Sequence, residues 1–299
     1  MSQRNSSMSL LQNIKFWAPK KEADGSYSPS PLALKLATQK KSDYSHDQYE
    51  NAYTGNRFKV LMICTEEKNM VMANGKKFST GNHPVEMIVP MLHLKNAGFE
   101  IDIITPTGKP AQIEMWAMPP EDEAVNALYQ EYKHRFDNPG SVADFVQHSL
   151  IDDSPYVAVF LPGGHGAMLG LPENRDVGRI IRWSHQQGQH MLAICHGPAA
   201  LIAANIDIGE VEFIYNGYDM NAFPDAVDKQ TPLMGYMPGH RPWRIGEALS
   251  KVGITTLNKK IKGDCYVDRK LISGDSPLAA NEFGKISANA LLEQLAQGD

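Results

Sequence analysis

The sequence predicts an α/β protein with a mostly parallel sheet that helices cover on both faces. Short apolar runs of strand length recur along the chain, and segments with helical periodicity lie between them. Runs that are apolar throughout suit strands buried on both faces. Strands that alternate with helices favour parallel pairing with right-handed crossovers. The predicted strands are Phe58–Thr65, Phe99–Thr105, Tyr156–Pro162, His190–Cys195 and Lys270–Gly274.

The segments between and after these runs are predicted to be helices. The first, Pro84–Ala97, has a broad apolar face, and Gly98 is expected to end it. The last is expected to begin with Ser276 as N-cap and Pro277 at the first helical position. The predicted helices are Pro84–Ala97, Asp176–Gln187, Pro198–Asn205 and Pro277–Leu295.

Two regions depart from this alternation. Residues 1–56 are polar and irregular, with one short helix expected near Leu32–Thr38. Such an arm is either disordered or ordered by lying along a domain or a dimer partner. Within the α/β domain at 57–299, residues 107–150 are interpreted as a small inserted cap beside the carboxyl edge of the sheet, where ligands of open α/β sheets bind. The helices of this cap are expected at Glu121–Phe136 and Val142–Ser149.

Composition limits the function classes. The chain has 299 residues, of which 42% are hydrophobic and 21% charged, as is ordinary for a soluble globular protein. A net charge of −5 gives no electrostatic footprint for nucleic acid or an anionic membrane, so nucleic-acid binding is not expected as the main function. No signal peptide or membrane-spanning run is apparent. The cysteines, Cys64, Cys195 and Cys265, are odd in number and far apart, which argues against a disulfide framework or zinc ribbon and favours the cytoplasm.

The stretch around Cys195 carries the strongest indication of chemistry. An apolar run ends at Cys195, Gly197 permits a sharp turn, and Pro198 suits the first position of a helix. A cysteine at this junction matches the nucleophile elbow of hydrolases, with Cys in place of Ser. The helix N-terminus is expected to favour the thiolate, and His196 can accept the thiol proton. The alternative is a buried core cysteine, but the His-Gly-Pro that follows favours the nucleophile.

A glycine-rich loop follows the preceding strand. Gly163 and Gly164 lie in the sequence Phe160-Leu-Pro-Gly-Gly-His-Gly-Ala167. They are interpreted either as an ordinary turn or as an oxyanion hole, since glycine lets backbone N–H groups approach a reacting oxygen.

Glu86 has two interpretations. With His83 as N-cap it occupies the N3 position of a capping box. Alternatively it lies close to Cys195, because the first and later βα turns converge on one edge of the sheet. There it would act as general acid or base with a pKa raised by burial.

Asp225 and Asp228 follow the cysteine helix in one loop. Each is interpreted either as a capping or solvated residue or as the carboxylate that orients His196 in a nucleophile–base–carboxylate set. The loops at 235–240 and 274–277 are expected to be structural. No H-x-x-H or H-E-x-x-H pair occurs, so an obvious zinc site is absent from the sequence.

Together these segments resemble the ThiJ/PfpI superfamily, and within it the bacterial HchA type. The resemblance spans about residues 57–295 in consistent order. The matching stretches are FSTGNHPVE (78–86), EMWAMP (114–119), VFLPGGHGAMLGL (159–171), CHGPAA (195–200), FPDAVDKQT (223–231), GYMPGH (235–240) and GDSPLAAN (274–281).

The resemblance implies a flavodoxin-like three-layer sandwich with a small cap domain, and a homodimer. It implies Cys195 as nucleophile, His196 and Asp228 as its triad partners, and Glu86 as the carboxyl group beside the thiol. Asp228 is favoured over Asp225 because the acid of the family falls on the second aspartate of the loop.

The implied activity is glutathione-independent conversion of methylglyoxal to lactate (glyoxalase III, classed as a lactate dehydratase), without a cofactor. Deglycation of proteins and holding-chaperone action are also implied, so the expected partners are methylglyoxal, glyoxal and glycated or unfolded proteins. In the expected mechanism Cys195 attacks the aldehyde carbon, and N–H groups of Gly163–Gly164 and the elbow hold the oxyanion. Glu86, helped by His196, then moves a proton between the two carbons, and water releases lactate.

One departure from the family concerns metal. Members of the type carry a site of two histidines and one carboxylate in the cap cleft, and the matching positions here are Lys95, Glu100 and Tyr132. His93 and His134 are near in sequence but are not the matching positions. We therefore predict no metal at this place.

Two other functions are retained as alternatives. One is a non-enzymatic holding chaperone that uses an exposed apolar patch. The other is a cysteine hydrolase of the glutamine-amidotransferase class, whose elbow reads G-x-C-x-G-x-Q with a distant H-x-E. The elbow here reads Ala193-Ile-Cys-His-Gly-Pro, and no H-x-E follows it, which ranks the hydrolase last.

Overall fold

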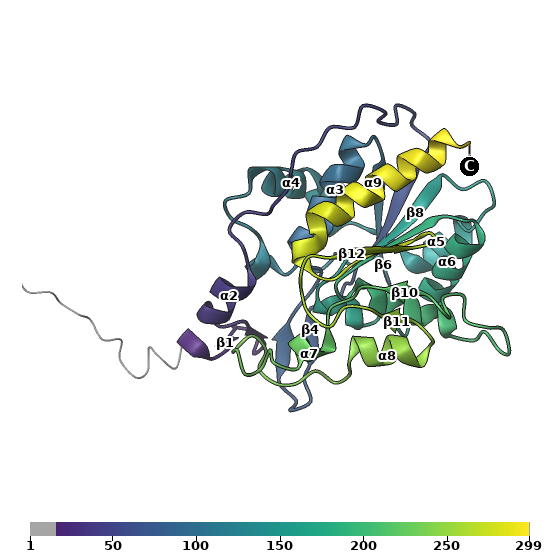
Figure 1. Ribbon diagram of the computed structural model, residues 1–299. Helices are drawn as coiled ribbons and strands as arrows, with labels where there is room; N and C mark the ends of the chain where they lie inside the picture. The colour runs from purple at the N-terminus through teal and green to yellow at the C-terminus, as the bar shows by residue number, and fades with distance from the viewer. Residues whose placement is uncertain (1–15, 299) are drawn as a thin grey trace, which may run out of the picture.

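A seven-stranded sheet forms the centre of the molecule in a computed structural model that describes residues 16–298 (Figure 1). The strand order is β12-β13-β9-β8-β3-β6-β7, and all neighbours are parallel except the antiparallel pair β12–β13. The predicted parallel α/β sheet is confirmed, and all five predicted strands belong to it. The strands are β3 (Lys59–Ile63), β6 (Glu100–Thr105), β7 (Gly140–Ser141), β8 (Tyr156–Leu161), β9 (His190–Ile194), β12 (Cys265–Asp268) and β13 (Leu271–Gly274).

Helices cover both faces of the sheet and complete three layers (Figure 1). Strand β3 illustrates why both faces need to be covered, because its side chains alternate between two separate apolar cores. Leu61 and Ile63 face one core, whereas Val60 and Met62 face the other, and all four are fully buried. The helices of the first core are α5 (Val142–His148), α6 (Arg175–Gln186), α8 (Ile245–Lys251) and the 3-10 helix η3 (Gly197–Asn205); those of the second are α3 (Pro84–Asn96), α4 (Glu123–Asp137) and α9 (Ala280–Ala296).

Two helix predictions are wrong in detail. The segment after Cys195 is a 3-10 helix, in which the Ala199 N–H donates to His196 O at 3.0 Å. The start of this 3-10 helix is packed tightly against β8, since a Cβ on Gly197 would overlap the Leu161 carbonyl oxygen. Ser276 precedes the 3-10 helix η4 (Pro277–Ala279) and makes no capping bond, because its hydroxyl donates to Asp275 Oδ1 at 2.6 Å instead.

The described part of the N-terminal arm, residues 16–56, lies along the domain. Its helix α2 (Pro31–Ala37) begins where Ser30 Oγ accepts from the Ala33 N–H at 3.1 Å. Further along, the Tyr49 hydroxyl lies 2.9 Å from His93 Nδ1 on α3. Residues 1–15 of the predicted arm lie outside the described residues. The arm also supplies β1 (Lys20–Lys21) and β2 (Tyr27–Ser28) to a small sheet of order β1-β2-β5-β4, with β4 (Asn69–Val71) and β5 (Lys77–Ser79).

Residues 107–150 form the 3-10 helix η1 (Met115–Ala117), then α4, β7 and α5. Strand β7 joins the edge of the main sheet beside β6, so this segment is tied to the central sheet as well as lying over α3. Within residues 16–298, no helix combines the length and the apolar character needed to cross a membrane. The remaining elements are η2 (His165–Met168), β10 (Asp219–Met220), α7 (Asp225–Asp228) and β11 (Thr255–Thr256).

Candidate active site

Cys195 lies at the carboxyl end of β9 in a strained backbone conformation. Its φ of +59° is in the left-handed region, which costs a non-glycine residue roughly 1–3 kcal/mol. Two hydrogen bonds hold it there: the Cys195 N–H donates to Gly274 O at 2.9 Å, and its carbonyl accepts from the Phe223 N–H at 2.8 Å. The fold thus imposes on this cysteine the sharp strand-to-helix turn expected of a nucleophile elbow.

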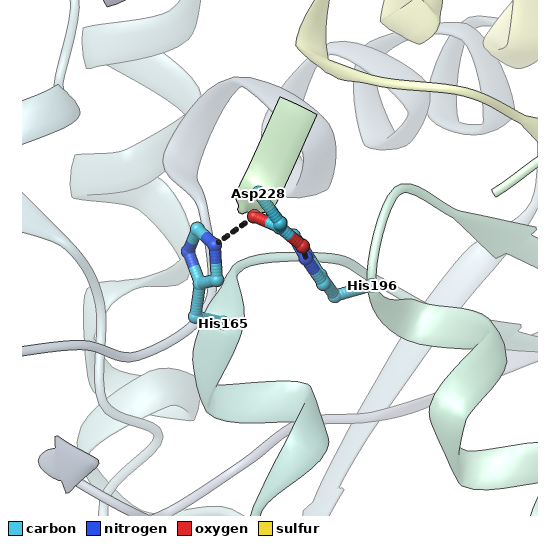
Figure 2. Close-up of side chains that lie close together, drawn as sticks. All are labelled: His165, His196 and Asp228. Atoms are coloured by element: carbon cyan, nitrogen blue, oxygen red, sulfur yellow. Dashed lines mark hydrogen bonds and ion pairs between the residues drawn. The ribbon is translucent and has the colours of Figure 1, made fainter. Parts of the chain in front are cut away.

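A chain of buried hydrogen bonds leads away from the thiol. Cys195 Sγ lies 3.3 Å from His196 Nδ1, and His196 Nε2 lies 2.8 Å from Asp228 Oδ2. His165 Nε2 lies 3.1 Å from the other oxygen of Asp228, as Figure 2 shows, and Arg241 pairs with Asp228 at 2.6 Å. Burial acts to raise the pKa of Asp228, but its contacts with His196 and His165 outweigh burial and hold the pKa well below its usual range.

The protonation states follow from this arrangement. Burial lowers the pKa of His196, which is therefore neutral at pH 7. Since the ionised Asp228 only accepts hydrogen bonds, Nε2 of His196 carries the ring proton and Nδ1 is left with a free lone pair. That lone pair faces the thiol, so His196 is placed to accept its proton.

Glu86, in the first turn of α3, lies on another side of the sulfur. It is fully buried, and its carboxyl group faces the Cys195 thiol and the Gly164 N–H. The capping-box interpretation is wrong, because His83 is the N-cap but makes no side-chain capping bond and Glu86 turns toward the cysteine. Burial, with a smaller contribution from the nearby Glu114, raises the pKa of Glu86 well above its usual value. At neutral pH this side chain is a carboxylic acid.

Burial raises the pKa of Cys195, and the neighbouring carboxyl group of Glu86 adds to the rise. The expectation that the elbow favours the thiolate is therefore wrong for the resting protein. The Gly164 N–H acts in the expected direction, but it is outweighed by the removal of the sulfur from water. The resting pair is a thiol beside a carboxylic acid, so reaction at sulfur needs a base, and His196 is the adjacent one.

Gly163 and Gly164 shape the wall next to these groups. A Cβ on Gly163 would overlap Glu86 Oε2 and come within 2.7 Å of Cys195 Cβ, so only glycine fits there. Gly164 has a φ of +95°, and its N–H faces both the Glu86 carboxyl group and the Cys195 sulfur. Of the elbow's own N–H groups, that of Cys195 is engaged by Gly274 and is not free to bind an oxyanion.

The structure distinguishes the two loop aspartates. Asp225 accepts hydrogen bonds from the Gly246 and Glu247 N–H groups at 3.1 and 3.0 Å, and so caps the first turn of α8. Asp228 is 2% exposed and is the aspartate that reaches His196. A capping role therefore accounts for Asp225.

Cys195, His196, Glu86 and Gly164 line a mostly apolar cavity of about 360 Å³, which also extends to helix α2 of the N-terminal arm. The arm therefore forms part of the cavity wall. Sequence reasoning missed four residues in or behind the cavity: Glu114 and His165, which are buried, and Tyr236 and Arg241, which are partly buried. Only the first three lie within stretches that carry the family resemblance, while Arg241 directly follows one of them.

The residues at the family's metal positions do not suit a divalent cation. Lys95 brings an ammonium group that donates to Glu131 Oε1 at 2.6 Å. At the third position, the Arg135 guanidinium lies over the Tyr132 ring, 5.0 Å from its centre. Two fixed positive charges would repel a metal ion there.

Among the described residues, His165, His196 and Asp228 form one further group with metal-ligand geometry, with ligand atoms within 4.8 Å of one another (Figure 2). Arg241 already supplies a cation to this carboxylate. We therefore interpret the group as a hydrogen-bonded relay.

Comparison with known proteins agrees with the geometry. The DJ-1/PfpI family matches residues 78–210. A protein/nucleic acid deglycase HchA of Pseudomonas aeruginosa (strain UCBPP-PA14) is 46% identical over 272 residues, which cover 91% of this chain and 93% of that protein. A protein of the same name from Staphylococcus aureus is 41% identical over 278 residues, covering 93% of this chain and 94% of its own length.

Solved structures show the same fold at lower sequence identity. A glyoxalase III of Candida albicans superposes with a TM-score of 0.60 at 22% identity, over 78% of this chain and 97% of that one. The 24-kDa rapid encystment protein of Francisella tularensis gives a TM-score of 0.65 at 23% identity, over 78% and 99% of the two chains. These likenesses support the flavodoxin-like sandwich predicted for the fold.

Proposed function

The chain belongs to the DJ-1/PfpI family, and from this premise we propose that it is a cysteine-dependent enzyme that converts methylglyoxal to lactate without glutathione. The observation that carries the proposal is the surroundings of one sulfur atom. Cys195 has a neutral imidazole 3.3 Å away and a buried carboxyl group beside it, and all three line an apolar cavity. A base and a proton-carrying acid on one nucleophile suit addition to a carbonyl followed by proton transfer between carbons.

In the first step the sulfur adds to the aldehyde carbon, C1. The thiol proton passes to His196, and Asp228 stabilises the resulting imidazolium. Glu86 gives its proton to the C1 oxygen, which the Gly164 N–H is placed to help stabilise. The product is a hemithioacetal beside a Glu86 carboxylate.

In the second step Glu86 removes the hydrogen of C1 as a proton, while His196 protonates the C2 oxygen. Glu86 then delivers its proton to C2, and His196 takes the proton from the C1 hydroxyl. This leaves an S-lactoyl thioester, and water cleaves it to lactate and the free thiol. The last proton on His196 returns to Glu86, so the cycle consumes one methylglyoxal and one water and requires no hydride acceptor.

Deglycation would use the same site. The adduct of methylglyoxal with an amine keeps two oxygens on adjacent carbons, so attack by Cys195 at C1 releases the amine and the remaining steps give lactate. The proteins at 41–46% identity are named protein/nucleic acid deglycases, which supports this activity here. The methylglyoxal adducts of protein amino groups and of nucleic-acid bases are then both substrates. Their shared chemistry is sufficient for this, and no nucleic-acid-binding surface is required.

The direct test is lactate formation by the wild-type protein. Incubated with methylglyoxal, without glutathione and with a chelator, it should produce lactate at the same rate as without chelator. A chelator should have no effect because every proton transfer in the proposed steps is assigned to a side chain and none to a metal ion. Lactate is followed by an enzymatic assay, with heat-unfolded protein as the blank. Absence of lactate from the folded protein would contradict the proposal.

A holding chaperone is the second candidate, and one surface feature favours it. Leu233 is 86% and Leu36 64% exposed, and Leu36 and Met234 also line the cavity. We call these three residues the apolar rim. Exposed apolar side chains gathered at a cavity mouth suit the binding of unfolded segments.

If the apolar rim holds unfolded chains, Leu233→Ser should weaken suppression of thermal aggregation of a client protein while lactate formation stays unchanged. Light scattering measures the first effect. Leu257→Ser, which alters an exposed leucine lining a different pocket, is the matched control. Equal suppression by both variants would exclude the rim as the binding surface.

The cytoplasmic location and the homodimer stay predictions from the sequence. The cysteine-hydrolase alternative is less well supported than the carbonyl chemistry, because hydrolysis alone assigns no task to the buried carboxylic acid of Glu86.

A further inference from the structure

A second buried carboxyl group lines the cavity and has no part in the steps above. Glu114, just before η1, is 1% exposed and lines the same cavity as Cys195 and Glu86. Its Oε1 accepts a hydrogen bond from Thr80 Oγ1 at 2.8 Å. Backbone N–H groups of Gly81 and His165 also face the carboxyl group, so its position is fixed by several donors.

The other oxygen of this carboxyl group lacks a partner. Glu114 Oε2 is buried and accepts or donates no hydrogen bond among the described residues. Burial raises the pKa of Glu114 to about 8, so the group is protonated at neutral pH. Since Thr80 donates to Oε1, the proton is expected on Oε2. A buried donor without an acceptor is costly, and a bound oxygen atom would satisfy it.

We propose that Glu114 is a substrate-binding residue that donates a hydrogen bond from Oε2 to the second oxygen of a compound with two vicinal oxygens, while Cys195 engages the neighbouring carbonyl. The site would thereby select 1,2-dicarbonyls and their adducts over compounds with a single carbonyl. Other titratable side chains that line the same cavity include Glu86, Tyr236, Cys195, His83, His165 and His196. Burial raises the pKa values of the first three and lowers those of the histidines, so all six are uncharged at neutral pH. The inference deepens the proposed function and rests on it for the identity of the natural substrate.

The test measures how well small ketones protect Cys195 from alkylation by iodoacetamide. Hydroxyacetone has two vicinal oxygens and acetone has one, and neither needs to be turned over. The wild type at pH 7 should be protected at about 2- to 13-fold lower concentrations of hydroxyacetone than of acetone, the range that one uncharged hydrogen bond provides. Mass spectrometry of the Cys195 peptide gives the rate of alkylation.

Two variants separate binding from structure. Glu114→Gln keeps an oxygen for Thr80 and places an amide donor where Oε2 lies, so it should keep the preference. Glu114→Ala removes the donor and should abolish the preference, while the alkylation rate without ketone stays within about twofold of wild type if the thiol is undisturbed. Should the alanine variant fold poorly, the test uses Thr80→Val and Glu114→Gln instead. Thr80→Val leaves Oε2 in place, so both variants should keep the preference for hydroxyacetone, and its loss in either folded variant would count against the inference.

The pH dependence gives a second readout. In the wild type the preference for hydroxyacetone should decline as the pH rises through about 8, because ionised Glu114 can no longer donate. In Glu114→Gln it should persist to higher pH.

An unchanged preference in Glu114→Ala would overturn the inference, as would loss of the preference in a folded Glu114→Gln. The two proposals fail separately. Lactate formation without any preference defeats the role of Glu114, and a preference without lactate formation defeats the glyoxalase activity.

Discussion

Replacing Cys195 with alanine is expected to lower the rate of lactate formation from methylglyoxal by about 10³-fold or more. The sulfur is the atom that bonds to substrate, and loss of a nucleophile removes the whole covalent route rather than one stabilising contact. Because the thiol is 4% exposed and lines the cavity, the smaller side chain should be accommodated there without unfolding. Initial rates at saturating methylglyoxal measure the effect, and a thermal melt checks the fold.

The chain provides its own control. Cys265 on β12 is a partly exposed thiol that lies outside the cavity lined by Cys195. Cys265→Ala should form lactate at the wild-type rate. If Cys195→Ala also kept the wild-type rate, the covalent mechanism would be wrong, whatever the source of the lactate.

The sequence was enough to predict the sheet and the place of the nucleophile. Uninterrupted apolar runs of strand length are typical of strands buried on both faces, and on this basis the strand that precedes Cys195 was predicted within one residue of its observed end. The carboxyl ends of such strands meet at one edge, so an approach of Glu86 to Cys195, although 109 positions separate them (195 − 86), was one of the two interpretations that the sequence allowed. The other was a capping box, and the family resemblance favoured the position beside the thiol.

What the sequence could not show was the degree of burial at that edge. The sign of the pKa shift of Cys195 depends on how much water reaches the sulfur, and no local pattern records this. The role of Arg241 was hidden for a related reason, since turns and loops separate it from its partner Asp228, which lies 13 positions earlier (241 − 228). The position of the Glu114 carboxyl group depends on donors from two separate segments, Thr80 with Gly81 and His165, which only the folded chain brings together.

Replacing Glu86 with glutamine is expected to lower kcat about 10²- to 10⁴-fold, the range that general acid–base groups contribute. Glutamine keeps the shape that Gly163 accommodates but cannot carry a proton between C1 and C2. The thiol should still react with iodoacetamide, so the variant separates nucleophilicity from proton transfer. Glu100→Gln, which alters a side chain that is 61% exposed on β6, is the control and should keep full activity. A Glu86→Gln enzyme within threefold of wild type would remove Glu86 from the mechanism.

The same substitution should make the protein more stable, by an amount that grows with pH. Burial raises the pKa of Glu86 in the folded state, whereas in the unfolded chain it returns to about 4.3. Above that value the folded state holds a proton that the unfolded state has released, so the free energy of unfolding falls as pH rises, by up to about 1.4 kcal/mol per pH unit until the folded-state pKa is reached.

Glutamine has no such proton, and the pH dependence of every other group is common to both proteins. Urea unfolding at pH 5, 6, 7 and 8 should therefore give curves for the two proteins that separate progressively, with Glu86→Gln the more stable. Parallel curves would mean that Glu86 is ionised in the folded protein, and the carboxylic acid that gives its proton to the C1 oxygen would then be absent. Higher stability together with lower kcat would show that the buried acid is kept for its chemistry at the expense of stability.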